Sequence, residues 1–508
     1  MNSESVTLPR NTNQAHGLGQ FALDFLAGRL GTPSDAVFQQ VERFHRDSMA
    51  CGVSALAARA NAPTLLRAEA MRYGCPPGDG SACFGSIAPV HPEKAVAANC
   101  SAVREWDSNG TNFGYNPARG HTRGEFGHND FYPVAVAAAQ LSRADGNRTL
   151  CAMILLDEIR GRLAEVYSLK DHKIDHVVHG AIASAVVFAA MSGATAEQIE
   201  SAIGLVVAHY IPFRAIRHGR QLSDSKGASA ALSAEVAVLS ARRAMRGFVG
   251  PADIFRNSEA IFSLFEPPHQ SDCSPFDLTL SCAGDDFALM GMHFKLGLYE
   301  HQSAGAIQGL IDLLAAYPAL MADPDQLRAI EVTIYEPAFH IIADPAKRNP
   351  TTRQSADHSL FYIIATLLRK AIGQKRSGWR ELMLLPDDYG DEALRHPQTR
   401  RFIERMELRH GGSSFDEKYP DGIPTTLAID HATLGHLSSG LVMYPEGHAR
   451  AKTGQLDSLL DHKFQALAAP AVSDVAALER RFTNLGDRSP EEIAALYDFE
   501  IRGCQAQP

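Results

Sequence analysis

The sequence predicts a mainly α-helical fold, in which both ends of the chain form an all-helical domain and the middle forms an inserted α+β lid domain. Apolar residues recur at helical spacing over about residues 20–260. Strand-like alternation appears near Gly291 and is interleaved with further helices. Helical spacing returns over residues 455–503. The predicted domains are residues 1–288 (helical domain, first part), 289–450 (α+β lid domain) and 451–508 (helical domain, C-terminal part).

Helices in the first part follow from periodic apolar residues and from the signals that end them. Gly31-Thr32-Pro33 and Gly193 are stop signals, and nearby Ser and Thr residues supply N-caps for the next helix. Helices are expected at residues 21–29, 36–60, 133–143, 150–167, 179–191, 196–209 and 228–246.

The middle of the chain mixes strand and helix patterns. Strands are expected at residues 292–298, 329–335, 425–430 and 440–444. Helices are expected between them at residues 302–317 and 355–370. In the tail, helical spacing gives an apolar stripe of Leu456, Leu459, Leu460, Phe464 and Leu467.

Composition excludes several classes of protein. The 508 residues are 45% hydrophobic, as in folded globular chains, and the net charge of −10 argues against a general nucleic-acid binder. The longest apolar runs, such as residues 181–191, are too short to cross a membrane, and the polar N-terminus does not resemble a signal peptide. We therefore expect a cytoplasmic protein with neither nucleic-acid nor membrane partners. Eight scattered cysteines without a CxxC pair disfavour zinc-ribbon and iron–sulfur sites.

The common cofactor and hydrolase fingerprints, GxGxxG, the P-loop, HExxH and GxSxG, are missing. The remaining candidates are polar clusters. In the first cluster, Asp107, Asn109 and Thr111 share a loop, and His128 follows a Gly- and Asn-rich stretch. A carboxylate, an amide, a hydroxyl and an imidazole can converge there on one ligand. The alternative is a capped, solvated loop.

A second cluster contains histidines at helical spacing. In a helix, His172, His176 and His179 would share one face, which is a geometry that a metal can use. The apolar run that follows indicates that one side faces the core instead. Structural histidines and an acid–base or anion-binding imidazole are the other interpretations.

The third and fourth clusters are Arg214, Arg217, His218 and Lys226, and His301 with its neighbours. Guanidinium groups bind carboxylates and phosphates through paired hydrogen bonds, and Lys226 precedes a helix whose dipole favours a bound anion. A solvated basic surface is the alternative for this cluster. His301 lies between a predicted strand and a predicted helix, so it would project from the lid into an interdomain cleft.

Together these clusters resemble the MmgE/PrpD family. The resemblance covers about residues 18–500, and no single block carries it. The matching blocks are WDSNGT (106–111) with GH (127–128), KIDH (173–176), RAIRHGRQLSDSKGASAA (214–231), HFKLGLYEHQSA (293–304), IEVTIYEPA (330–338), MYPEGHAR (443–450) and DHKF (461–464).

The resemblance implies a two-domain enzyme, usually a homodimer, that acts on a citrate-like polycarboxylate without metal, iron–sulfur cluster or other cofactor. The clusters and the resemblance together give two sets of site residues. The expected catalytic residues are Asp107, His128, His176, Lys226 and His301. The expected substrate-binding residues are Thr111, Asn109, Arg214, Arg217 and His218.

The expected reaction is the metal-independent dehydration of a citrate-like tricarboxylate, first of all 2-methylcitrate to 2-methyl-cis-aconitate. Dehydration needs a base for the proton α to a carboxylate, positive charge for the developing enolate, and an acid for the leaving hydroxyl. Lys226 and Arg217 can supply the charge, the histidines can exchange protons, and Asp107 can orient groups or act as the base.

Two departures from the family's dehydratases leave the substrate open. Gly110 stands where they have a second acid, and extra residues separate Thr111 from Gly127. The alternatives are a decarboxylase or an epimerase of a related polycarboxylic acid, or a polycarboxylate-binding protein without turnover.

Overall fold

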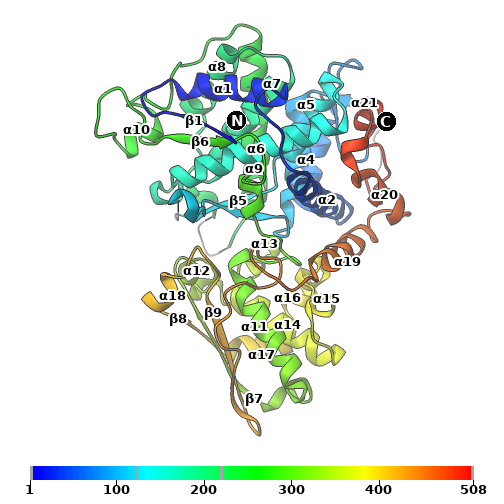
Figure 1. Ribbon diagram of the computed structural model, residues 1–508. Coiled ribbons are helices and arrows are strands. Elements are labelled where there is room, and N and C mark those ends of the chain that lie inside the picture. The colour runs from blue at the N-terminus through cyan, green and yellow to red at the C-terminus, as the bar shows by residue number, and fades with distance from the viewer. Residues whose placement is uncertain (1–3, 122–123, 218–220, 505–508) are drawn as a thin grey trace.

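The computed structural model describes residues 4–121, 124–217 and 221–504. Helices make up most of this part of the chain, and they group into two bodies, one above the other in Figure 1. The upper, helical body contains α1–α10 and the C-terminal helices α20 and α21. The lower, sheet body contains α11–α18 and the largest sheet of the described chain. The mainly α prediction is therefore confirmed.

The helical body is arranged around α7, of which every residue is buried because its sequence is apolar on all sides. Helices α5, α6, α8 and α9 contact it. The helices of this body are α1 (Gln14–Leu26), α2 (Asp35–Ala57), α3 (Asn61–Ala70), α4 (Pro92–Glu105), α5 (Tyr132–Ser142), α6 (Gly146–Val166), α7 (Val177–Met191), α8 (Ala196–His209), α9 (Asp224–Met245) and α10 (Ile261–Phe265).

Capping explains why some of these helices begin where the sequence predicts. Thr195 and Gln198 form a reciprocal capping box at the start of α8, whose bounds equal the predicted range. Asp145 caps α6 by accepting a hydrogen bond from the Arg148 amide at 2.9 Å. Helices α3 and α4 were not predicted; α4 leads directly into the first polar cluster.

Short antiparallel pairs connect the helices of this body. They are β1 (Ser5–Leu8) with β6 (Leu278–Ser281), β2 (Ser81–Ala82) with β3 (Pro89–Val90), and β4 (Thr111–Phe113) with β5 (Glu125–His128). In the last pair Thr111 lies opposite His128. The first polar cluster is therefore held partly by a strand pair, where the sequence predicts a loop.

The sheet body is built on a four-stranded sheet of order β10-β9-β7-β8. Its strands are β7 (Leu327–Ile334), β8 (Met406–His410), β9 (Thr425–His431) and β10 (Gly435–Ser438). β8 runs parallel to β7, whereas β9 runs antiparallel to it. The strands expected at residues 329–335 and 425–430 are confirmed, while β8 and β10 were not predicted.

Helix α11 packs on β9, and α14 packs on α11 and α17. Helices α11 and α14 correspond to the helices expected at residues 302–317 and 355–370. The helices of the sheet body are α11 (Ala304–Ala316), α12 (Ala338–Ile342), α13 (Arg353–Ala356), α14 (Leu360–Gln374), α15 (Trp379–Leu382), α16 (Asp391–Leu394), α17 (Pro397–Glu404) and α18 (Ser413–Asp416).

Two expected strands are wrong. Residues 292–298 form an irregular segment, and residues 440–444 contribute only an isolated bridge between Val442 and Thr425. In the first segment both the apolar residues and the polar His293 and Lys295 are buried. The alternation therefore reflects a segment that is surrounded on all sides, and not a strand with one solvated face.

The C-terminal helices α19 (Leu456–Ala468), α20 (Val475–Phe482) and α21 (Pro490–Ala494) return to the helical body. Helices α19 and α20 contact α2, and α21 contacts α5. Most of the expected apolar stripe of α19 is buried, with Leu456 only partly so. The boundaries at residues 288 and 450 stay predictions. In the described chain we find no helix with the length and apolar character needed to span a bilayer.

Candidate active site

A cavity of about 660 Å³ lies between the two bodies. From the helical body its lining includes Arg104, Asp107, His128, His176, Arg214 and Arg217. From the chain that leads into and forms the sheet body it includes Glu300, Lys347 and His358. Its size is ordinary for a small-molecule site. Residues that are far apart in the sequence therefore meet around one charged cavity that is partly open to solvent.

Asp107 is the centre of the charge network beside this cavity. It follows the C-terminus of α4, is 1% exposed, and accepts a hydrogen bond from Lys295. Its Oδ2 lies 3.4 Å from Lys226 Nζ and 3.5 Å from a terminal nitrogen of Arg104. Burial raises the pKa of Asp107, but Arg104, Lys295 and Lys226 together hold that pKa well below its usual value. The carboxylate therefore stays ionised.

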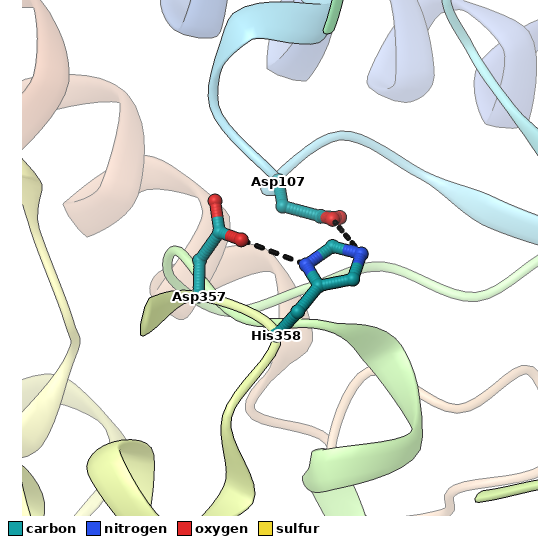
Figure 2. Close-up of side chains that lie close together, drawn as sticks. All are labelled: Asp107, Asp357 and His358. Atoms are coloured by element: carbon teal, nitrogen blue, oxygen red, sulfur yellow. Dashed lines mark hydrogen bonds and ion pairs between the residues drawn. The ribbon is translucent and has the colours of Figure 1, made fainter. Parts of the chain in front are cut away.

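Asp357 and His358 bring a second part of the network from the sheet body. Figure 2 shows His358 between the two carboxylates, with Nε2 3.3 Å from Asp107 Oδ2 and Nδ1 2.7 Å from Asp357 Oδ1. Asp357 Oδ1 also lies 2.8 Å from Lys226 Nζ. Burial raises the pKa of Asp357, but Lys226 and His358 bring it to about 2.

The group in Figure 2 has the composition of a metal site, because its ligand atoms lie within 4.8 Å of one another. Its oxygens already neutralise cationic side chains, however. Lys295 and Lys226 contact Asp107, and Lys226 and Arg353 contact Asp357. A divalent ion there would be repelled by these cations, so the donor set fits an ion-pair network better than a metal centre.

His128, on β5, and His176, just before α7, lie side by side with ring centroids 5.4 Å apart. Arg104 lies 3.4 Å from His128 Nε2, and Lys295 Nζ lies 3.5 Å from its Nδ1. Burial, Arg104 and Lys295 hold the pKa of His128 well below its usual value. An imidazolium would face two cations, so the ring is neutral, with one ring nitrogen that carries no proton.

His176 is also neutral at working pH. Burial holds its pKa well below the usual value, with Asp175 opposing and Arg217 adding to the effect. Its Nε2 is buried and has no hydrogen-bond partner among the residues that the structure describes. His176 is therefore a second candidate proton acceptor at the cavity.

Two arginines of the third sequence cluster line the same cavity. Arg214 and Arg217 belong to the short helix η3 (Arg214–Arg217). Arg217 donates hydrogen bonds to both oxygens of Asp175 and, at 2.9 Å, to Ser229. This fixes its guanidinium at the cavity wall. His218 lies outside the described residues, so its expected role stays a prediction.

Other expected site residues surround the cavity without appearing in its described lining. Lys226 contacts Asp107 and Asp357, as given above. His301 is buried, and its ring stacks on His293 with centroids 4.9 Å apart. Thr111 pairs through its backbone with His293, and the Asn109 amide donates to Asp130 at 2.5 Å. The roles expected of His301, Thr111 and Asn109 stay predictions.

The single helical face of His172, His176 and His179 does not form. His172 lies in the short helix η2 (Lys170–His172), and its ring stacks against Tyr167 and Phe265. His176 precedes α7, so only His179 lies within that helix. The metal interpretation of this cluster therefore loses its geometric basis.

Several network residues were not selected from the sequence. They are Lys295, Lys347, Asp357 and His358, whereas Arg104 and Glu300 belong to the first and fourth sequence clusters but were given no role there. Lys295 is fully buried between Phe294 and Leu296, and a lysine inside such an apolar run was an available signal. Asp357 and His358 had no such signal, because their role depends on contacts across the two bodies.

Packing explains the glycine at position 110. A Cβ atom there would lie 1.9 Å from Asn129 Oδ1 and 2.5 Å from the Phe44 ring. No side chain fits without displacing both neighbours. A second acid is therefore excluded at this position by its surroundings.

Comparisons with known proteins agree with this architecture. The model of the MmgE/PrpD N-terminal domain matches residues 21–273, and that of the MmgE/PrpD C-terminal domain matches residues 300–485. Curated relatives include the 2-methylcitrate dehydratase of Escherichia coli strain K12, 24% identical over 321 residues, which are 62% of this chain and 62% of the relative. Another is the 2-methylcitrate dehydratase of Salmonella typhimurium strain LT2, 23% identical over 336 residues, or 65% of this chain and 64% of the relative.

The aligned part of the chain thus spans less than two thirds of the length of these curated relatives. The two family models, in contrast, match most of the chain and meet near the junction of its two bodies. On this evidence the chain belongs to the MmgE/PrpD family.

Proposed function

We propose that this protein is a hydro-lyase that dehydrates a citrate-like polycarboxylate, with 2-methylcitrate to 2-methyl-cis-aconitate as the first candidate reaction. One observation carries the proposal: the imidazole of His128 lies between Arg104 and Lys295 at the wall of the cavity between the two bodies. A base beside fixed positive charge is what proton removal next to a carboxylate requires.

His128 is the proposed base. It takes the proton from the carbon α to a carboxylate, and the electron pair of that bond forms the new double bond. Negative charge develops on the adjacent carboxylate, where Arg104 and Lys295 stabilise it without having to reorganise. The oxygens of Asp107 already accept a hydrogen bond from Lys295 and pair with Arg104 and Lys226. Its proposed role is to position Lys295 and Arg104.

Positive charge elsewhere in the cavity supports a polycarboxylate as substrate. Lys173, Arg214 and Lys347 line it, from the helical body and from the sheet body. Guanidinium and ammonium groups contributed by both bodies suit a ligand that carries several carboxylates. Closure of the two bodies on such a ligand would also exclude water.

The alternative reactions use the same groups, and a substrate panel separates them. Purified protein is incubated with 2-methylcitrate, citrate, cis-aconitate and a small amino-dicarboxylate, and products are identified by mass and by chiral separation. Loss of one water supports the proposal. Loss of carbon dioxide assigns a decarboxylase, and inversion without mass change assigns an epimerase.

The non-catalytic alternative rests on Gly110, which stands where the family's dehydratases have a second acid. Tight citrate binding by the folded protein, with no reaction on the whole panel, would support it. A homodimer also remains part of the proposal, and light scattering in solution tests it.

A further inference from the structure

Glu300 lines the same cavity and has no role in the scheme above. It precedes the short helix η5 (His301–Ser303) and is 7% exposed. Its Oε2 accepts a hydrogen bond from the Gln302 amide at 2.8 Å, and its own amide donates to the Asp357 carbonyl at 2.7 Å. The carboxyl group is therefore held in a fixed position at the cavity wall, one residue away from the histidine that the sequence singles out.

Dehydration also needs an acid, because hydroxide is a poor leaving group. The imidazoles of His128, His176 and His358 do not fit this task, and the fourth imidazole of the lining, His340, is largely exposed and paired with Glu336. Burial and neighbouring cations keep the pKa values of His128 and His176 well below the usual value, and burial and Lys226 lower the pKa of His358 to about 3. At neutral pH the rings of His128, His176 and His358 are therefore unprotonated, and none of the three carries an acidic proton for the leaving group.

The surroundings of Glu300 favour its protonated form. Burial and the neighbouring carboxylate of Asp107 raise its pKa to about 7, with Lys295 opposing. Lys347, Tyr335 and Tyr419 are the other titratable groups that face it. A carboxylic acid with such a pKa, paired with a neutral imidazole in one cavity, matches the usual division between acid and base.

We propose that Glu300 is the general acid of the dehydration. Its carboxyl proton goes to the oxygen of the leaving hydroxyl while the C–O bond breaks, the bonding electrons remain on that oxygen, and water departs. His128 holds the proton taken from carbon, and its transfer through solvent to the Glu300 carboxylate restores the starting state. This inference rests on the proposed hydro-lyase function.

A matched substrate pair tests the assignment. The probes are 2-methylcitrate and its analogue with fluorine in place of the hydroxyl, since fluoride is a much weaker base than hydroxide and leaves with less help from an acid. Alkene formation is measured for both, and fluoride release with an ion-selective electrode. The variants are Glu300→Gln, which keeps the shape but has no acidic proton, and His128→Gln, which lacks the base.

The expected pattern is selective. Glu300→Gln lowers kcat on 2-methylcitrate by about 10²- to 10⁴-fold but stays within about tenfold of wild type on the fluoro analogue. His128→Gln loses both reactions, because each begins with proton removal. The wild-type rate falls as pH rises through about 7, where Glu300 loses its proton, and Glu300→Gln lacks that alkaline limb.

Other outcomes overturn the assignment, and they differ from a failure of the proposed function. If wild type dehydrates 2-methylcitrate and Glu300→Gln is equally fast, Glu300 is not the acid. If Glu300→Gln loses both reactions while its Tm is unchanged, the residue positions the site and does not supply the proton. If wild type forms no alkene from any acid of the panel, the hydro-lyase proposal itself is wrong.

Discussion

Lys226 of α9 donates a hydrogen bond to Asp357 at 2.8 Å, and the same ammonium lies 3.4 Å from Asp107. One buried cation therefore joins a carboxylate of the helical body to a carboxylate that follows α13 in the sheet body. Burial lowers the pKa of Lys226, while Asp357 and Asp107 raise it. The contacts of Lys226 with Asp107 and Asp357 therefore position the two sides of the cavity relative to each other.

Removing this cation should destabilise the protein. Lys226→Met leaves two buried carboxylates without their shared partner, and we expect a loss of about 3–5 kcal/mol in the free energy of unfolding. Urea unfolding measures it, with exposed Lys452→Met as the control. A double-mutant cycle with Asp357→Asn should give a coupling of about 0.5–3 kcal/mol. Additive effects would show that the two residues do not interact.

Asp107→Asn should mainly impair chemistry. The substitution keeps the volume but removes the charge that positions Lys295 and Arg104, so we expect kcat/KM to fall by about 10²- to 10³-fold. Steady-state kinetics measure it. The matched control is Asp430→Asn on the exposed face of β9, which should stay within twofold of wild type. An equally active Asp107→Asn enzyme would remove Asp107 from the account.

Gly110→Ala should destabilise the fold at the first polar cluster. The added methyl group collides with Asn129 and Phe44, and we expect a cost of about 1–3 kcal/mol in the free energy of unfolding. Gly373→Ala, at an exposed helical position with open space around it, is the control and should be neutral or stabilising by about 0.5–1 kcal/mol. Equal effects would contradict the packing explanation of Gly110.

Buried His45 should make stability depend on pH. Burial lowers its pKa to about 3, and neither ring nitrogen has a hydrogen-bond partner in the described chain. The stability that the neutral His45 ring provides is complete above the pKa of about 6.5 that histidine has in the unfolded chain. It is lost as pH falls toward 3, because the unfolded chain binds a proton there before the folded protein does. The His45→Phe variant has no imidazole at this position and does not lose this stability. Between pH 7.5 and pH 5, its free energy of unfolding should therefore rise by about 2 kcal/mol relative to that of wild type.

Urea unfolding at the two pH values checks this prediction, with exposed His269→Phe as the control. His269→Phe removes an exposed imidazole and so controls for the exchange of histidine for phenylalanine itself. A relative stability of His45→Phe that does not vary with pH would mean that His45 binds a proton as readily in the folded protein as in the unfolded chain.

Local signals in the sequence were sufficient for much of the helical body. Capping residues and apolar spacing predicted α8 to the residue, and the apolar stripe predicted α19. The segment at residues 292–298 shows where such signals fail. Alternation also arises when an irregular segment is buried on all sides, and only the folded chain distinguishes that case from a strand.

Part of the site was also accessible from the sequence. Asp107, His128, His176, Arg214 and Arg217 line the cavity as their clusters suggested. The partners from the sheet body were not accessible. Asp357 and His358 acquire their environment from residues that are distant along the chain, and no local pattern encodes those contacts.

The most direct test of the central claim is product analysis of 2-methylcitrate incubated with wild type and with Asp107→Asn. Mass and the ultraviolet absorbance of the conjugated alkene are followed together. The account predicts a product lighter by one water from wild type, and almost none from the folded variant. A correctly folded wild type that leaves 2-methylcitrate unchanged, or a variant that matches wild type, would contradict it.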